Sequence, residues 1–234
     1  NYTYGELFNE INANTGGINC GVEVFDRADS TEEFQAMFSV RGKALYTKLD
    51  FLFKMIGEIL NSSKLEDTKR LYEIVASVKS RAQVNLTGAG HSTAVLRAAA
   101  YSSPMAAFQD EMAGIGYYQF IEKLEKDFEQ RKEETVEELC KLMKKILRPE
   151  NFMISYTGER ESMETVQKLA GAVKAGLGTE PVEKSEEKLT CTKKNEGFKT
   201  SGQVQYVAQT GNFKKKGLEY TGALEILKVI LSYD

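Results

Sequence analysis

The sequence has only one histidine, His91, among its 234 residues, and this scarcity limits the chemistry that the chain can perform alone. Zinc hydrolases hold their metal with at least two histidines or with closely paired cysteines. The chain contains none of the patterns H-E-x-x-H, H-x-x-E-H or C-x-x-C. We therefore predict no metal site, no cofactor and no catalytic residue within it, and we expect it to be inactive on its own. The sequence assigns no substrate-binding residue.

Nucleophile and phosphate-binding motifs are also missing. The chain has no G-x-S-x-G sequence, and His91 lies too close to Ser92 for the two to form a catalytic triad. Residues 87–90, Thr-Gly-Ala-Gly, lack the spacing and the following Lys-Ser or Lys-Thr of a P-loop, so they predict a hinge or a close helix contact. We interpret His91 as a structural residue at a helix start, with a substrate-contacting imidazole as the alternative.

Disulfides, long apolar runs and excess positive charge are absent too. Cys20, Cys140 and Cys191 are odd in number and far apart, which is typical of a reducing compartment. We expect an intracellular protein, cytoplasmic if bacterial and in an organelle matrix if eukaryotic. No stretch approaches about eighteen apolar residues, so no transmembrane helix is expected. The net charge of −3, from 31 basic and 34 acidic residues, argues against nucleic acid or a membrane as partner.

The first 60 residues predict a helix, two strands and a second helix. Apolar residues at helical spacing from residue 4 to residue 11 are followed by Gly16-Gly17, a helix stop. Residues 18–24 and 34–40 alternate with period two around a polar connection, which predicts an antiparallel strand pair. A stripe of apolar residues over 45–60 predicts the next helix.

Helical spacing continues through the middle of the chain. Ser63 and Glu66 match a capping box and predict the start of a long helix. Ser103-Pro104 predicts an N-cap followed by proline in the first helical turn. The helix after it is expected to break near Gly114 and Gly116. The helices expected after the first 60 residues cover 63–78, 91–101, 105–128, 133–147 and 162–175, with a last one from 222 onward.

The C-terminal third predicts short strands and a linker. Residues 152–157 and 204–209 are expected to be strands. The polar, charged stretch 178–201 predicts a linker with one short strand near 189–192. The three lysines at 214–216 are interpreted as a hairpin turn.

The last helix carries a strongly apolar stripe between Ala223 and Leu231. One strand and one helix cannot bury such a face, so its domain is expected to be incomplete. The chain also begins without an initiator Met or a signal pattern, and we expect both ends to be cut points. An exposed stripe of this kind would favour a dimer.

Several short motifs, in order, resemble one family. The matching residues are Tyr4, Glu6, Leu7, Ile11 and 15–18; Gly90, His91, Arg97 and 102–104; Gly114, Ile115, Phe120 and Leu124; and 205–207, Asn212, Phe213, Gly217 and Gly222. They resemble the presequence protease and falcilysin branch of the pitrilysin-like inverzincin metallopeptidases. The likeness covers most of the chain and is weakest over 178–201.

The resemblance implies an α/β (α+β) chain with an antiparallel-rich mixed sheet packed on long helices, the fold of LuxS and mitochondrial-processing-peptidase-like metallohydrolases. Family members carry four related domains in two halves that close around a peptide, with zinc in the N-terminal half. By this likeness residues 1–178 form the third domain without its first strands, 179–200 form a linker, and 201–234 begin the fourth domain. The opening helix would be a degenerate copy of the zinc-binding helix, because it offers Glu6 and Glu10 but no histidine.

The resemblance therefore implies a non-catalytic C-terminal-half fragment of a zinc endopeptidase that degrades unstructured peptides in a closed chamber. The chain would form chamber wall and substrate surface, and its partners would be the N-terminal catalytic half and an unstructured peptide. The alternative is a non-enzymatic binding or scaffold subunit of the same fold, as in the core subunits of the respiratory complex. A third reading, a helical regulatory domain unrelated to peptidases, predicts no mixed sheet.

Overall fold

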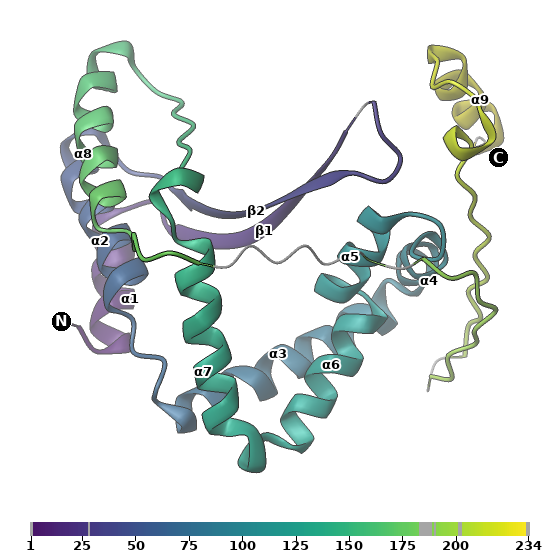
Figure 1. Ribbon diagram of the computed structural model, residues 1–234, viewed down its shortest axis with the longest axis horizontal. Helices are drawn as coiled ribbons and strands as arrows, with labels where there is room; N and C mark the ends of the chain where they lie inside the picture. Colours follow the sequence, from purple (N-terminus) through teal and green to yellow (C-terminus); the bar gives the residue numbers. More distant parts are fainter. Residues whose placement is uncertain (1, 28, 183–188, 190, 201–202, 233–234) are drawn as a thin grey trace. The chain divides into compact units, whose positions relative to one another are not determined.

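A computed structural model describes residues 2–27, 29–182, 189, 191–200 and 203–232 (Figure 1). The described residues form two compact units. The first unit draws on Asn1–Glu23, Ala36–Ile74 and Asp127–Glu186, and the second on Val24–Gln35, Val75–Lys126 and Glu187–Asp234.

In chain order the elements are α1 (Tyr4–Asn14), β1 (Ile18–Asp26), β2 (Phe34–Gly42), η1 (Tyr46–Lys48), α2 (Leu49–Ser62), α3 (Thr68–Gly88), α4 (Gly90–Ala99), α5 (Pro104–Ala113), α6 (Ile115–Lys126), α7 (Phe128–Ile146), η2 (Pro149–Asn151), η3 (Arg160–Ser162), α8 (Met163–Ala175), η4 (Lys214–Lys216) and α9 (Gly222–Ser232).

The first helix, α1, is closed by local hydrogen bonds at both ends. The hydroxyl of Thr3 accepts the N–H of Glu6 at 3.3 Å, and the carboxylate of Glu6 accepts the N–H of Thr3 at 2.8 Å, which completes a capping box. After Thr15, Gly17 takes a φ of +108°, which glycine adopts without steric cost. The predicted stop at Gly16-Gly17 is confirmed.

The two predicted strands form a two-stranded antiparallel sheet, β1 with β2. The N–H of Gly16 donates to the carbonyl of Lys43 at 2.6 Å, and the N–H of Lys43 donates to the carbonyl of Gly17 at 3.2 Å, which closes the open end of the hairpin. Among the described residues these strands pair only with each other. An α+β chain with an antiparallel sheet and long helices is confirmed.

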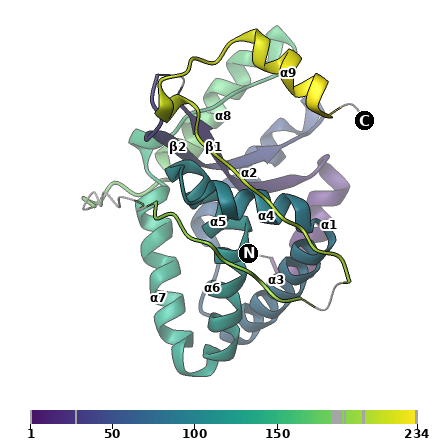
Figure 2. The same cartoon turned by 90° about the vertical axis from the view of Figure 1, so that its right-hand side faces the viewer.

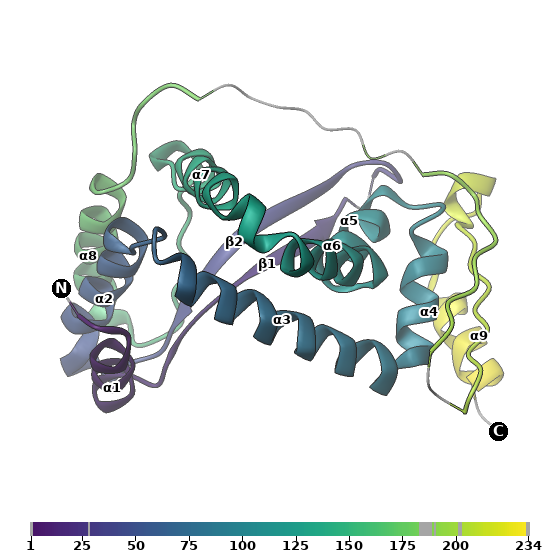
Figure 3. The ribbon, with the colours of Figure 1, turned by 90° about the horizontal axis from the view of Figure 1, so that it is seen from below.

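The core of the first unit lies between α2 and α8. Figure 3 shows α1 and α8 on either side of α2. The side chains buried there are Leu49, Leu52 and Met55 of α2 and Val166, Ala170 and Val173 of α8. The helical spacing of both sets places them on one face of each helix. The predicted stripe is confirmed from Leu49 onward, but Leu45 is exposed ahead of η1 and does not belong to it.

The capping box predicted at Ser63 and Glu66 is wrong. The hydroxyl of Ser63 donates to the carbonyl of Ile59 at 2.7 Å and so closes the end of α2. The helix α3 begins later, at Thr68, and the carboxylate of Asp67 accepts the N–H of Arg70 at 3.0 Å. An aspartate with a free N–H two or three residues ahead is as good an N-cap as serine, and here Asp67 takes that role.

In the second unit α4, α5 and α6 pack consecutively, and residues 203–213 pass along α4 (Figure 2). The hydroxyl of Ser103 accepts the N–H of Ala106 at 3.3 Å and Pro104 fills the first turn of α5, as predicted. Gly114 separates α5 from α6, which confirms the expected break. Phe128, expected to end this helical region, instead begins α7.

The strands predicted at 152–157 and 204–209 are wrong, because both segments run without strand pairing among the described residues. Of the short strand predicted near 189–192, residues 189, 191 and 192 lie in no strand and residue 190 falls outside the described residues. The three lysines form the turn η4, closed by Gly217 at a φ of +79°, but no strands flank it, so it is no hairpin. A strand needs a neighbour to satisfy its backbone.

The apolar side of α9 is exposed, including Ile226, Ile230 and Leu231. Dimer formation through this helix stays a prediction, as do the expected cut points and the domain boundaries at 178 and 201. In the part of the chain that the structure describes, no helix has the length and apolar character needed to span a membrane.

Candidate functional site

The structure places His91, the one site candidate from the sequence, in the first turn of α4 beside Tyr206. The two ring centroids lie 6.2 Å apart, and a Cβ added at Gly90 would overlap the Tyr206 ring. The glycine-rich run provides the break between α3 and α4, as predicted, while the close approach at Gly90 is to Tyr206, which lies in no helix. His91 is exposed, and its structural role stays a prediction.

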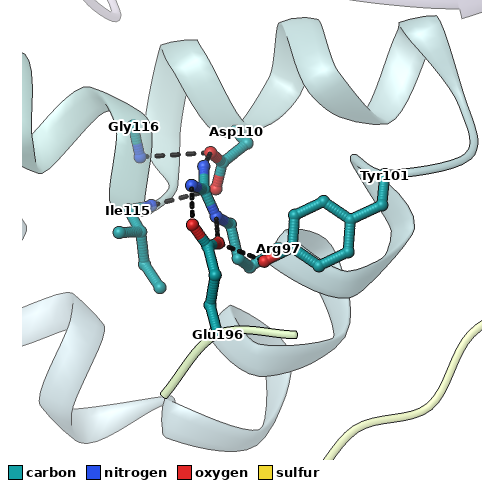
Figure 4. Close-up of polar contacts among 6 residues, drawn as sticks. All are labelled: Arg97, Tyr101, Asp110, Ile115, Gly116 and Glu196. Atoms are coloured by element: carbon teal, nitrogen blue, oxygen red, sulfur yellow. Dashed lines mark hydrogen bonds and ion pairs between the residues drawn. The ribbon is translucent and has the colours of Figure 1, made fainter. Parts of the chain in front are cut away.

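A cluster of polar side chains around α4 and α5, which we call the Arg97 cluster, is the strongest candidate site. It consists of Arg97, Tyr101, Asp110 and Glu196, all within the second unit (Figure 4). The guanidinium of Arg97 lies between the carboxylates of Asp110 and Glu196. Its Nη1 donates to Oδ2 of Asp110 at 2.7 Å, its Nε donates to Oε2 of Glu196 at 2.9 Å, and its Nη2 donates to Oε1 of Glu196 at 3.3 Å.

Asp110 is the most deeply buried residue of the Arg97 cluster, with a side chain only 2% exposed. Its Oδ1 accepts the N–H of Ile115 at 3.0 Å and its Oδ2 accepts the N–H of Gly116 at 3.1 Å. These are the first two residues of α6, where unpaired N–H groups and the helix dipole favour an anion. A Cβ at Gly114 would overlap Oδ1 of Asp110 and lie 2.9 Å from its Cα, so the glycine break makes room for this carboxylate.

Glu196 contributes the second carboxylate from a segment with no helix or strand, residues 191–200. The hydroxyl of Tyr101 also donates to its Oε2. The hydrogen bonds from Arg97 and then from Tyr101 lower the pKa of Glu196 below its ordinary value. Burial raises the pKa of Tyr101, and its bond to Glu196 adds to that effect, so the hydroxyl remains a donor at neutral pH. The same contacts with Glu196 and Asp110 raise the pKa of Arg97.

A cavity of about 190 Å³ adjoins the cluster. Its lining residues are Arg97, Ala100, Tyr101, Ala107, Asp110, Glu111, Thr192 and Lys194. The donors here are a guanidinium, a phenol and an ammonium group, which are suited to holding a carboxylate. No three or more His, Cys, Asp or Glu side chains gather to hold a metal anywhere in the described residues. The carboxylates of Asp110 and Glu111 line the cavity too, and Asp110 is already paired with Arg97, so Arg97, Tyr101 and Lys194 are the groups suited to meet an anion.

A second candidate lies in the first unit, between the β1–β2 hairpin and α2. This apolar groove has a volume of about 130 Å³. Its lining residues are Ile18, Asn19, Cys20, Phe38, Val40, Ile56, Ile59 and Leu60. The alternation of β1 and β2 places Ile18 and Cys20 on one face of β1, and Phe38 and Val40 on one face of β2. Cys20 and Phe38 nevertheless remain exposed. This face offers an apolar surface beside unpaired strand edges.

The Arg97 cluster was not identified from the sequence. Arg97 entered only as part of a family pattern, Gly114 as part of that pattern and as an expected helix break, and Glu196 lay within a predicted linker. A usable signal was present, because an aspartate four residues before Gly114 and six before Gly116 can reach the N–H groups that open the next helix. Nothing local points to Glu196, which is 99 residues from Arg97 in the chain.

Comparison with known proteins places the chain among peptidase-associated sequences. The family model described as "Peptidase M-16C associated" matches residues 1–124. Protein HypA of Clostridium perfringens is 33% identical over 234 residues, which cover 100% of this chain and 24% of that protein. Presequence protease 1, chloroplastic/mitochondrial, of Arabidopsis thaliana is 25% identical over 98% of this chain and 21% of its own length. The mitochondrial presequence protease of Yarrowia lipolytica is 30% identical over 55% of this chain and 13% of its own length. The chain thus spans about a quarter or less of these relatives.

Proposed function

Since the chain belongs to the peptidase M-16C associated family, we propose that it is part of the C-terminal half of a zinc-dependent endopeptidase that degrades unstructured peptides. The observation that carries this proposal is the alignment of nearly the whole chain with a presequence protease four to five times its length. The family match excludes the reading as a helical regulatory domain unrelated to peptidases.

Within that enzyme the chain would form chamber wall and substrate surface, while zinc would be held by the N-terminal half. Support for a substrate surface comes from the β1–β2 hairpin, whose strands pair only with each other among the described residues. An extended peptide can add to such an edge through main-chain hydrogen bonds. The apolar groove beside α2 would accept its side chains.

The domain division follows the same proposal. Residues 1–178 would be the third domain, 179–200 a linker, and 201–234 the start of the fourth. The relatives named mitochondrial or chloroplastic support an organelle matrix if the protein is eukaryotic, and we propose the cytoplasm if it is bacterial.

The test is peptidase activity of the full-length protein that contains this chain. It should cleave an unstructured peptide of about twenty residues, leave a folded protein of the same composition intact, and lose activity to a zinc chelator. An upstream H-x-x-E-H in its reading frame is expected. A reading frame without that motif, together with tight peptide binding and no cleavage, would instead establish the non-enzymatic binding subunit.

A further inference from the structure

We propose that Arg97 and Tyr101 form a binding site for the carboxylate of a peptide ligand, and that Glu196 occupies this site as an internal, displaceable ligand. The proposal rests on the proposed function for the class of ligand, a peptide. It goes beyond that function by naming the residues that bind and the group that competes.

Three donors converge on the Glu196 carboxylate. Arg97 approaches it with two nitrogens of one fork, Nε at 2.9 Å and Nη2 at 3.3 Å, and Tyr101 adds its hydroxyl. Bidentate guanidinium–carboxylate pairs combine strength with a fixed geometry. The same three donors can receive any carboxylate that reaches them.

The site keeps its shape without Glu196. The third nitrogen of Arg97, Nη1, is held at 2.7 Å by Asp110, which is itself fixed by the N–H groups of Ile115 and Gly116. Because these partners all belong to α4, α5 and α6, removal of Glu196 leaves the fork aimed at the same position. The Asp110 charge is shared with two N–H groups at a helix start, so Arg97 keeps attraction for a second anion.

Glu196 is placed on a segment that is suited to release. Residues 192–200 are exposed and belong to no helix or strand, and the Glu196 side chain is 26% exposed. The neighbouring Phe198 ring lies 5.7 Å from the Arg97 guanidinium and is also exposed. Segments with few buried contacts open at low free-energy cost.

The adjoining cavity gives a ligand somewhere to lie. Arg97 and Tyr101 line it together with Lys194, whose ammonium also lowers the pKa of Glu196. Its volume of about 190 Å³ is large enough for the terminal residue of a peptide. Two carboxylate sources share this chemistry, the C-terminus of a peptide and an acidic side chain.

The competition between Glu196 and an added carboxylate sets the expected effect. An internal ligand tethered on the same chain acts at an effective concentration of about millimolar. Glu196→Ala removes it, and we expect a peptide carboxylate to bind the variant about tenfold more tightly than it binds the unmodified chain. Glu219→Ala removes an exposed carboxylate elsewhere in the C-terminal segment and should leave the affinity unchanged.

Fluorescence anisotropy on the full chain tests this, with three labelled twelve-residue peptides: one with a free C-terminus and no acidic residue, its C-terminal amide, and the amide with one internal glutamate. The proposal is supported if Glu196→Ala increases the affinity for the free acid, for the glutamate peptide or for both, with no increase for the amide that lacks an acidic residue. The peptide that gains affinity identifies the source of the carboxylate. Adding Tyr101→Phe, which leaves the Arg97–Asp110 pair intact, should reverse at least half of that gain.

Equal affinity for acid and amide peptides in Glu196→Ala, or no binding of any peptide, overturns the carboxylate site. Since the readout is binding by this chain, it is independent of cleavage. A carboxylate-specific gain in a protein whose full-length form cleaves nothing would refute the proposed peptidase while leaving the site in place.

Discussion

Nη1 of Arg97 donates to Oδ2 of Asp110 at 2.7 Å, and this ion pair joins α4 to α5 at a position that is nearly closed to water. A charge removed from water needs full compensation, and here Asp110 receives it from Arg97 and from two N–H groups of α6. The pair therefore organises three helices and also orients the guanidinium toward Glu196.

Asp110→Ala should strongly destabilise the second unit. The substitution leaves Arg97 without its buried partner and two N–H groups of α6 without an acceptor, and loss of one member of a buried pair costs about 3–5 kcal/mol. Urea unfolding followed by far-ultraviolet circular dichroism suits a chain with no tryptophan. The control is Glu111→Ala at an exposed neighbouring position, expected within about 0.5 kcal/mol of the unmodified chain. Equal midpoints for the two variants would show that Asp110 is not structurally required.

Gly114→Ala should destabilise through a direct clash. The added methyl group would overlap Oδ1 of Asp110 and lie 2.9 Å from its Cα, so the helix junction has to shift at a cost of about 1–3 kcal/mol. Gly88→Ala, at the end of α3 with no atom within 4 Å of the new Cβ, is the matched control and should be neutral or slightly stabilising. Thermal unfolding of both variants gives the comparison. A Gly114 variant as stable as the Gly88 variant would contradict the packing described at this junction.

Whether a structural feature could be predicted from the sequence depends on how far apart in the chain its interacting residues lie. Two capping contacts each span three residues: Thr3 with Glu6, and Ser103 with Ala106. The helices that they begin lie where the sequence pattern predicted them. The capping box predicted at Ser63 is wrong because a serine hydroxyl can equally donate to the carbonyl four residues earlier, here that of Ile59. Which of the two bonds forms is decided only in the folded chain. Local rules thus locate helices but choose poorly between competing caps.

Strands and the candidate site depend on partners distant in sequence. Residues 152–157 and 204–209 have the composition of strands, yet composition does not supply the neighbour that a strand requires. Likewise, the charge pattern around Glu196 is that of a solvated linker, and only its position beside Arg97 distinguishes it from the other acidic residues there. The Glu196 part of the candidate site could therefore not be identified before the fold was known.

Met55→Ala should weaken the first unit through a cavity. Met55 is fully buried between α2 and α8, and truncation of a buried methionine costs about 2–5 kcal/mol. Met153→Ala makes the same chemical change where the side chain is 71% exposed, and its cost should stay below about 0.5 kcal/mol. The difference between the two midpoints in urea reports the stability that the buried side chain contributes. Similar midpoints would contradict the core assigned to α2 and α8.

The hydrogen bonds from Arg97 and Tyr101 to Glu196 should weaken as the pH falls. Its folded pKa is below the ordinary value of 4.5, so its contribution is fully present above pH 4.5 and is lost as the pH falls through the folded pKa. Carbon-13 NMR of the glutamate carboxyls gives the midpoint, which should lie below 4.5 and move upward in Tyr101→Phe because one hydrogen bond to the ionised form is removed. A midpoint that does not move in this variant would remove Tyr101 from the site.

The claim that this chain supplies surface while the metal lies elsewhere is tested most directly by the zinc content and peptide cleavage of the purified 234-residue chain. We predict less than one-tenth of a zinc ion per chain, about the level of adventitious metal, and no cleavage of an unstructured peptide with or without added zinc. One tightly bound zinc per chain, with cleavage that a chelator abolishes, would contradict the account.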